Sequence, residues 1–189
     1  MDEEMRSLIK NHLIPTLAKK KVVGCKWIYM IKEGIPGVEP LRFKAMLVAK
    51  GFAQKEEIDF NEVFAPVVIH SSLRILLALV VVNDMHLEQM DVKTAFLHGE
   101  LEEMIVMAQP RGYENLDKVD YVCLLKKSLY GLKQSPRQWY VRFDKFMAEN
   151  SFQRCCYDYC VNHKNLIDGD KIYLLLYVDD MLIACKHMD

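Results

Sequence analysis

Two adjacent aspartates interrupt the most apolar stretch near the end of the chain. Ile172–Val178 is almost wholly apolar, Met181–Ala184 is apolar as well, and Asp179 and Asp180 stand between them. Two β-prone runs around a two-residue break are typical of a β-hairpin. Carboxylates are rarely buried without partners, so these two need either an exposed turn or a partner of opposite charge. The sequence therefore predicts a hairpin that carries two carboxylates at its turn.

A third aspartate ends another apolar segment, Leu87–Val92, which reads as a strand. If one sheet joins this strand to the hairpin, Asp91 meets the other two carboxylates. Two like charges ~4 Å apart repel by about 4 kcal/mol at an effective dielectric constant of ~20. A shared proton or a bound divalent cation relieves that repulsion, and an all-oxygen cluster without His suits Mg²⁺. The residues alone leave a second interpretation open, in which Asp179 and Asp180 form an ordinary exposed turn.

The composition indicates a globular chain. Of its 189 residues, 51% are hydrophobic and 27% charged, which is the usual mix for a soluble protein and excludes disorder and collagen-like structure. The longest apolar run, Ile75–Val82, is far shorter than the ~20 residues that cross a membrane. The acidic start, Met1–Met5, predicts neither a signal peptide nor a transit peptide. The six cysteines are expected to be free thiols, and the spacing of Cys155, Cys156, Cys160 and His163 fits no zinc motif.

The net charge of −1 hides alternating blocks of charge. Residues 1–55 hold 11 Lys and Arg against 5 Asp and Glu, whereas residues 56–120 hold 4 against 13. Residues 121–154 are again basic, with 7 against 2, and residues 155–189 are acidic, with 3 against 6. Such blocks suit a protein that holds a polyanion with some segments and cations with others. They are equally compatible with the solvated faces of unrelated elements.

The order of predicted elements indicates an α+β fold, with helices packed on an antiparallel sheet. Residues 1–20 are expected to form a helix (2–13) and a linker, and residues 21–189 one domain. A buried helix over 73–82 is expected to be capped by Ser71 or Ser72, and a further helix to cover 138–149 behind a loop at 128–136. Strands are predicted at 21–32, 42–52, 87–92, 104–107, 122–127 and 153–162, with a short helical turn at 94–98.

Two short motifs surround the three aspartates. Tyr177-Val178-Asp179-Asp180 resembles the polymerase box of reverse transcriptases, and Asp91–Phe96 resembles their upstream motif, a metal-binding Asp with an aromatic residue five positions later. Four further segments, Arg42–Gly51, Phe64–Val68, Gln89–Gly99 and Ser128–Tyr140, resemble those of one subgroup, the copia-type LTR retrotransposons. The resemblance runs from about Lys21 to Ala184, in the family's order and near its spacing.

The resemblance implies a reverse-transcriptase palm-and-fingers fold, an antiparallel sheet backed by helices, with the thumb absent. It implies an RNA-directed DNA polymerase that transfers nucleotides to a primer 3′-hydroxyl by a two-metal mechanism. The implied partners are an RNA or DNA template-primer, deoxynucleoside triphosphates and, in a longer Pol polyprotein, integrase and RNase H segments, but no membrane. The implied location is the cytoplasm, in a virus-like particle, with the nucleus as an alternative.

Site residues follow from the same resemblance. Asp91, Asp179 and Asp180 would be catalytic and, with the carbonyl of Val92, would hold two Mg²⁺ ions, or Mn²⁺ in their place. The residues expected to bind the nucleotide are Phe96, Lys44, Lys50, Tyr130, Gly131, Tyr177 and Val178. Lys133, Gln134 and Arg137 are expected to hold the template and primer.

Simpler interpretations of these residues stay open. Phe96 is the implied steric gate against a 2′-hydroxyl, but it could also be a core residue. Lys133 could be one more solvated lysine, and Trp139 and Tyr140 fit a core better than base stacking. Arg137 stands at a predicted helix start, a poor place for a cation because of the helix dipole, which favours a phosphate contact.

Three residues depart from the copia-type pattern. Met46 stands where the pattern has Arg, Arg111 where it has a small residue, Pro or Glu, and Glu57 where it has Gly. The chain also stops nine residues after Asp180, whereas family members continue into a thumb and an RNase H domain. Two hypotheses result: an active polymerase core, or a truncated relic of a retroelement with the palm fold and metal site but negligible activity, at most a weak binder of nucleic acid.

Overall fold

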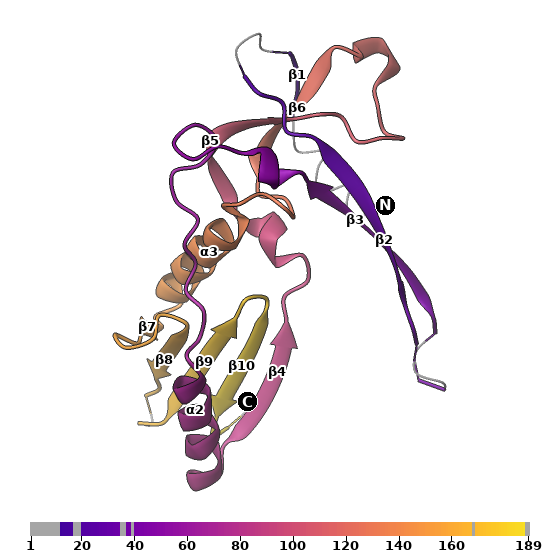
Figure 1. The fold of residues 1–189 in the computed structure, drawn as a ribbon. Coiled ribbons are helices and arrows are strands. Elements are labelled where there is room, and N and C mark those ends of the chain that lie inside the picture. Colours follow the sequence, from indigo (N-terminus) through magenta and orange to yellow (C-terminus); the bar gives the residue numbers. More distant parts are fainter. Residues whose placement is uncertain (1–11, 17–19, 35–36, 39, 168, 188–189) are drawn as a thin grey trace. The chain divides into compact units, whose positions relative to one another are not determined.

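The computed structural model describes residues 12–16, 20–34, 37–38, 40–167 and 169–187, and Figure 1 shows it as a mixed α+β protein. All strand pairs within its sheets are antiparallel, as the sequence predicts. The chain divides into two compact units. Unit 1 comprises residues 1–63 and 96–139, and unit 2 comprises residues 64–95 and 140–189. Among the described residues, no helix is long and apolar enough to span a membrane.

The first sheet of unit 1 has the strand order β1-β6-β5. Its strands are β1 (His12–Pro15), β6 (Tyr121–Lys127) and β5 (Glu100–Met107). The buried ends of β5 and β6 supply the β-branched and aliphatic residues that favour strands. Val23 joins this sheet to the second one, because it bridges to Met107 in parallel.

The second sheet of unit 1 is a two-stranded ribbon of β2 (Cys25–Lys32) and β3 (Arg42–Ala49). Alternate residues share one face of a strand, and Leu47 and Ala49 are buried on the face where Trp27 also lies. Together with residues of β5 and β6, they form the core of unit 1. Away from that core the ribbon is exposed, and Phe43 has 80% of its surface accessible.

Three short 3₁₀ helices complete the description of unit 1 and its boundary. They are η1 (Gly51–Ala53), η2 (Ala95–His98) and η3 (Leu116–Lys118). The second confirms the helical turn predicted at 94–98. Asn115 caps the third, since its side chain accepts a hydrogen bond from the Asp117 N–H at 3.0 Å.

Unit 2 is built on a five-stranded sheet with the order β4-β10-β9-β8-β7. Its strands are β4 (His86–Asp91), β10 (Asp180–Cys185), β9 (Lys171–Tyr177), β8 (Val161–Asn165) and β7 (Gln153–Arg154). Helix α2 (His70–Val82) lies against one face of this sheet (Figure 1). Leu76 of the helix packs there on Leu175 of β9 and Ala184 of β10, the strand that begins at Asp180.

Helix α3 (Ser135–Glu149) begins in unit 1 and continues in unit 2. Trp139, Phe143 and Met147 are buried at the i, i+4, i+8 spacing of a helical stripe. The predicted amphipathic helix is confirmed, although it begins three residues earlier than the predicted start at Gln138. Phe146, expected in the same stripe, is half exposed.

Two predicted elements are wrong where the structure describes them. Residues 12 and 13 do not end a helix, because His12–Pro15 pairs with β6; residues 2–11 of that predicted helix lie outside the described residues. The predicted strand 153–162 is broken between β7 and β8. Asp158 causes the break, because its carboxylate accepts hydrogen bonds from the N–H groups of Ile69 and Cys160 and so turns the chain.

The helix predicted at 73–82 exists but starts earlier and is less buried than expected. Ile69 occupies the N-cap position without a side-chain cap, so neither Ser71 nor Ser72 caps the helix. Leu76 is its one buried residue, whereas Val81 and Val82 are 80% and 81% exposed. Hydrophobicity predicted burial here, but only one face of the helix reaches the sheet.

Candidate active site

Asp91 and Asp180 lie directly opposite each other in unit 2. Asp91 is the last residue of β4, Asp180 is the first of β10, and the two are register partners. Side chains of directly opposed residues in an antiparallel pair lie on one face of the sheet, with Cβ atoms about 4.5–5.5 Å apart. Asp91 is exposed and Asp180 partly buried, so both carboxylates are open to solvent. The sheet thus brings together two of the three predicted catalytic residues.

Asp179 lies next to this pair, in the turn between β9 and β10. Its carbonyl accepts a hydrogen bond from the Val92 N–H at 2.9 Å, so main-chain pairing continues beyond the two strands. Tyr177 pairs with Asp180, which makes Val178 and Asp179 the turn residues instead of the predicted Asp179 and Asp180. Val178 has φ 60°, a left-handed conformation that is strained for a β-branched residue.

Gln89 is a neighbour of the carboxylates that the sequence did not single out as a site residue. It stands two positions before Asp91 and therefore shares its face of β4. Its Nε2 donates to Oδ1 of Asp180 at 3.3 Å. The signal that could have found it is the period of two along the predicted strand, counted back from Asp91.

The donor set of this region is made of oxygen atoms, which suits Mg²⁺ chemically. Asp91, Asp179 and Asp180 supply carboxylates, and Val92 supplies a main-chain carbonyl. Within the part of the chain that the structure describes, no three His, Cys, Asp or Glu side chains form a group placed to hold a metal ion. The backbone therefore places the predicted ligands next to one another, while their side chains do not converge as a three-ligand cluster.

Phe96 and Tyr130 meet in unit 1. Their ring centroids are 5.6 Å apart and the rings are inclined by 74°, an edge-to-face arrangement. Phe96 is partly buried, and Tyr130 packs against the core of unit 1. Phe96 is therefore not a fully buried core residue, and its role as a steric gate stays a prediction.

Gly131 follows Tyr130 and lies in close contact with the end of β3. It has φ +89°, and a Cβ at this position would lie 2.2 Å from the carbonyl oxygen of Ala49. The Ala49 N–H donates to the Tyr130 carbonyl at 2.7 Å. A Cβ on Gly51 would lie 1.9 Å from the Gly131 oxygen, so both glycines are needed for this approach.

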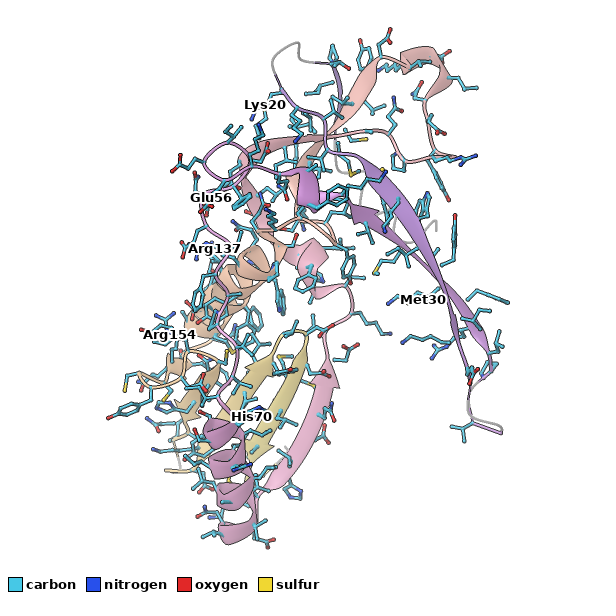
Figure 2. The ribbon with its side chains drawn as sticks, viewed as in Figure 1. Lys20, Met30, Glu56, His70, Arg137 and Arg154 are labelled. Atoms are coloured by element: carbon cyan, nitrogen blue, oxygen red, sulfur yellow. The ribbon has the colours of Figure 1, made fainter. Side chains whose placement is uncertain are left out.

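The lysines predicted to bind the triphosphate are exposed in unit 1. Lys44 lies on β3, on the face of the ribbon opposite Leu47, and Lys50 follows the end of that strand. Met46, which stands where the copia-type pattern has Arg, shares the face of Lys44. Figure 2 labels Met30, the register partner of Lys44 on β2. One face of the ribbon therefore mixes cations with methionines.

The three residues predicted to hold the template differ in accessibility. Lys133 is exposed, with its Nζ 5.0 Å from the centre of the Phe60 ring. Arg137, labelled in Figure 2, pairs with Glu62 at 2.8 Å in the first turn of α3. Gln134 has no exposed surface, and its amide is bonded to protein groups. The Gln134 side chain is thus enclosed by protein groups, and its template contact stays a prediction.

Trp139 and Tyr140 have the packing roles that the sequence favoured over base stacking. Trp139 is only 8% exposed, and Tyr140 donates its hydroxyl proton to the Tyr159 carbonyl at 3.1 Å. Burial raises the pKa of Tyr140 above its ordinary value. Both aromatic residues are structural rather than free to stack on bases.

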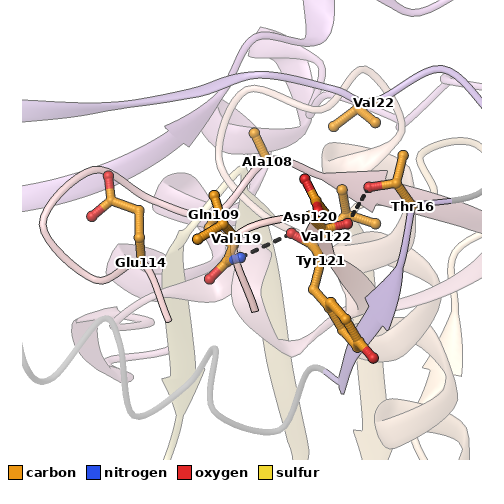
Figure 3. A pocket seen from close by; sticks show the side chains of 9 residues that line it. All are labelled: Thr16, Val22, Ala108, Gln109, Glu114, Val119, Asp120, Tyr121 and Val122. Carbon is orange, nitrogen blue, oxygen red and sulfur yellow. Dashed lines mark hydrogen bonds between the residues drawn. The ribbon is translucent and has the colours of Figure 1, made fainter. Parts of the chain in front are cut away.

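A shallow cavity of about 340 Å³ in unit 1 contains none of the predicted site residues (Figure 3). Its polar groups are bonded within the protein: Gln109 donates to the carbonyls of Lys118 and Tyr121, and Thr16 donates to that of Asp120. We therefore assign no functional site to it.

Comparisons with known proteins agree with the resemblance. The model of the family "Reverse transcriptase (RNA-dependent DNA polymerase)" matches residues 11–189. The chain is 50% identical to the retrovirus-related Pol polyprotein from transposon TNT 1-94 of Nicotiana tabacum, over 98% of this chain and 14% of that protein. It is 39% and 38% identical to the Pol polyproteins from transposons RE1 and RE2 of Arabidopsis thaliana, over 97% of this chain and 13% of each relative.

The chain spans about one seventh of the length of these curated relatives. No solved structure matches it. The extent of the family match and the identity to the plant Pol polyproteins confirm the resemblance found in the motifs. The chain belongs to the reverse transcriptase (RNA-dependent DNA polymerase) family, in its copia-type retrotransposon branch.

Proposed function

We propose that the chain is the polymerase core of a copia-type retrotransposon reverse transcriptase, which extends a primer 3′-hydroxyl with deoxynucleotides on an RNA or DNA template. One observation carries the proposal: Asp91 and Asp180, from the two motifs that the family shares, are register partners in one sheet. Nothing in local folding requires two acidic residues so far apart in sequence to face each other, since like charges directly opposite are destabilising.

The proposed roles of the unit 2 residues follow from their chemistry. We assign the five-stranded sheet to the palm, where Asp91, Asp179, Asp180 and the carbonyl of Val92 would hold two Mg²⁺ ions or Mn²⁺. When bound, the divalent ions would activate the primer hydroxyl and neutralise the leaving pyrophosphate. Tyr177 and Val178, half exposed at the turn, would contact the nucleotide.

Unit 1 would supply the nucleotide and template contacts. We assign the β2–β3 ribbon to the fingers, where the exposed Lys44 and Lys50 would bind the triphosphate. The ring of Phe96, supported by Tyr130, would exclude a 2′-hydroxyl by its bulk. Gly131 would let the main chain approach the new base pair, and Lys133 and Arg137 would bind template phosphates.

The proposed partners follow from the Pol polyproteins that the chain resembles: a template-primer, deoxynucleoside triphosphates and other segments of a longer Pol protein. The proposed location is a virus-like particle in the cytoplasm, with the nucleus as the alternative.

Primer extension tests the proposal. Residues 1–189 should add at least one deoxynucleotide to an oligo(dT) primer on poly(rA) in Mg²⁺, and Asp91→Asn and Asp180→Asn should each abolish the addition. Asp84→Asn is the matched control, because Asp84 is an exposed aspartate of the same unit and makes the same charge change. Equal activity in all four proteins would refute the assigned site.

The second candidate is a relic that binds nucleic acid weakly without synthesis. Two observations favour it: the aspartate side chains form no three-ligand group in the described structure, and Met46 replaces a cation on the ribbon face of Lys44. Wild-type protein that retains template-primer but extends none of it in Mg²⁺ or Mn²⁺ would support this candidate over the first.

A further inference from the structure

Two buried glutamines connect the segment after β3 to the start of α3 in unit 1. Gln54 is 4% exposed and Gln134 is fully buried. The Nε2 of Gln54 donates to Oε1 of Gln134 at 3.0 Å. Burying an amide without hydrogen bonds costs several kcal/mol, so a pair in this position needs partners at both ends.

Main-chain groups provide those partners. Oε1 of Gln54 accepts from the Lys133 N–H at 2.9 Å, and Nε2 of Gln134 donates to the Asp59 carbonyl at 3.1 Å. The same Nε2 also lies 3.4 Å from Oε2 of Glu103 on β5. The two amides therefore tie three segments of unit 1 together.

This chain of hydrogen bonds can run in one direction only. The Lys133 N–H can only donate, so it requires the oxygen of Gln54; the Asp59 carbonyl can only accept, so it requires the nitrogen of Gln134. The two remaining atoms, Nε2 of Gln54 and Oε1 of Gln134, are then a donor and an acceptor that face each other. An ionised glutamate at position 54 would still accept from Lys133 but could not donate to Gln134.

The segment held in this way, Tyr130–Lys133, is called here the 130–133 loop. Its other end is fixed by the main chain, through the Ala49 N–H bond to the Tyr130 carbonyl and the close approach of Gly51 to Gly131. The amide pair closes the opposite end at Lys133. At its first attachment the loop presents Tyr130, whose ring supports Phe96 edge to face.

We propose that Gln54 and Gln134 are positioning residues, which fix the 130–133 loop and, through Tyr130, hold the Phe96 ring in the orientation that selects deoxynucleotides. The proposal rests on the proposed function, since sugar selection requires a nucleotide beside Phe96. Neither glutamine touches the substrate; Gln134 takes this role in place of the template contact expected from the sequence.

The first test follows the loop itself. Gln54→Met keeps the length of the side chain and removes both hydrogen bonds, whereas Gln54→Glu keeps the acceptor for Lys133. The matched control is Gln109→Met, which removes an amide of unit 1 that bonds to Lys118, Asn115 and Tyr121; Figure 3 shows its bond to Tyr121. Amide hydrogen exchange of Lys133 and Ala49 should accelerate at least about tenfold in Gln54→Met, less in Gln54→Glu, and not in the control. Unchanged exchange in Gln54→Met would overturn the proposal.

The second test measures sugar selection by single-nucleotide addition. The ratio of kcat/KM for dTTP to that for UTP should fall about tenfold in Gln54→Met, mainly through a lower KM for UTP, and stay within about twofold in Gln109→Met. A purely structural role would lower kcat for both nucleotides and leave the ratio unchanged, which would overturn the proposal.

The outcomes separate this inference from the proposed function. If Phe96→Ala loses selection while Gln54→Met retains it, the proposed function stands and the positioning role fails. If wild-type protein adds no nucleotide at all, the proposed function fails, and the exchange of Lys133 and Ala49 alone decides whether the glutamines hold the loop.

Discussion

The N–H of Val92 donates to the carbonyl of Asp179 at 2.9 Å, one step beyond the pairing of Asp91 with Asp180. Main-chain bonding therefore fixes the turn of the β9–β10 hairpin beside the end of β4. This bonding holds the main chain of Asp179 beside Asp91 and Asp180. Placing Asp91 and Asp180 directly opposite each other brings two negative charges together, and the fold meets the cost of their repulsion.

That cost predicts how stability responds to charge. Asp180→Asn should raise the free energy of unfolding by about 0.2–1 kcal/mol without divalent ions, because it removes a like charge directly opposite Asp91. Thermal unfolding in EDTA measures the change, and Asp84→Asn serves as the control. An equal or greater gain in the control would mean that the repulsion comes from the overall negative charge of the unit and not from the pair of Asp91 and Asp180.

Magnesium should stabilise the folded protein by neutralising the same pair of carboxylates. An ion that binds the folded state at a hundred times its Kd stabilises it by about 2.7 kcal/mol. Mg²⁺ or Mn²⁺ should therefore raise the melting temperature of the wild type, and Asp179→Asn or Asp180→Asn should reduce that gain. Melting temperatures independent of divalent ions in all three proteins would favour the simple turn.

Phe96 should show a modest effect on stability and a large one on selection. Phe96→Ala removes a partly buried ring and its edge-to-face contact with Tyr130, for an expected loss of about 1–2 kcal/mol, below the ~3–5 kcal/mol of a core phenylalanine. Urea unfolding measures the loss, with the half-exposed Phe146→Ala as the control. Ribonucleotide addition should increase in the Phe96 variant alone. A loss near 4 kcal/mol without a change in selection would assign Phe96 to the core.

Two glycines of unit 1 allow crowding to be separated from backbone strain. Gly131 and Gly112 have φ of +89° and +85°, but a Cβ at Gly131 would clash with the Ala49 carbonyl at 2.2 Å, whereas nothing lies within 4 Å at Gly112. Gly112→Ala should cost about 1 kcal/mol from strain alone, and Gly131→Ala at least about 2 kcal/mol more. Chemical denaturation of both variants checks the difference. Equal losses would mean that the 130–133 loop is not tightly docked on β3.

Buried thiols predict a loss of stability at alkaline pH. Burial raises the pKa of Cys123 to about 11 and that of Cys160 to about 12. The folded state thus holds these protons more tightly than the unfolded state, whose thiols titrate near 9. The contribution of these two thiols to the free energy of unfolding is fully present below pH 9. It should fall as the pH rises towards 11–12, by at most about 1.4 kcal/mol per pH unit for each thiol. Urea unfolding from pH 8 to 10.5 measures the slope, and Cys160→Ser should reduce it, whereas the exposed Cys156→Ser should not.

Elements whose pattern continues over several turns or pleats could be predicted from the sequence. Such patterns are the helical stripe of α3, the alternation along β2 and β3, and the apolar runs of β9 and β10. They predict a helix or a strand correctly because the period of the hydrophobic residues agrees with the element that forms. His12–Pro15 could not be predicted, since its strand exists only by pairing with β6, far away in sequence. Asp158 could not be recognised as a strand break, because its two hydrogen bonds require Ile69 and the turn at Cys160.

The candidate site divides in the same way. The motifs single out Asp91, Asp179 and Asp180 as candidates. The pairing of Asp91 with Asp180 could not be predicted, because every residue of β4 is exposed and no alternation of burial sets its register with β10. The residue type of Gln134 suits a template contact, which stays a prediction, as well as the buried amide pair with Gln54 that the structure shows. Only the three-dimensional position of Gln54 distinguishes the two, and no pattern in the sequence connects these glutamines.

The ion pair between Arg137 and Glu62 predicts how nucleic acid affinity responds to a single charge. The two side chains meet at 2.8 Å and are both partly exposed, so the pair itself contributes little to stability. If Arg137 binds a template phosphate, Glu62 competes with that phosphate. Glu62→Gln should then tighten binding of a poly(rA)–oligo(dT) duplex and leave the melting temperature within about 2 °C.

Arg137→Gln should weaken binding of the same duplex and reduce the slope of log K against log salt by about one. Fluorescence anisotropy between 50 and 200 mM salt measures both effects. The control is Glu56→Gln, which removes the charge of another exposed glutamate of unit 1, labelled in Figure 2. If Glu62→Gln and Glu56→Gln tighten binding equally, general charge explains the gain. If Arg137→Gln leaves the salt slope unchanged, Arg137 serves the fold through Glu62 and not the template.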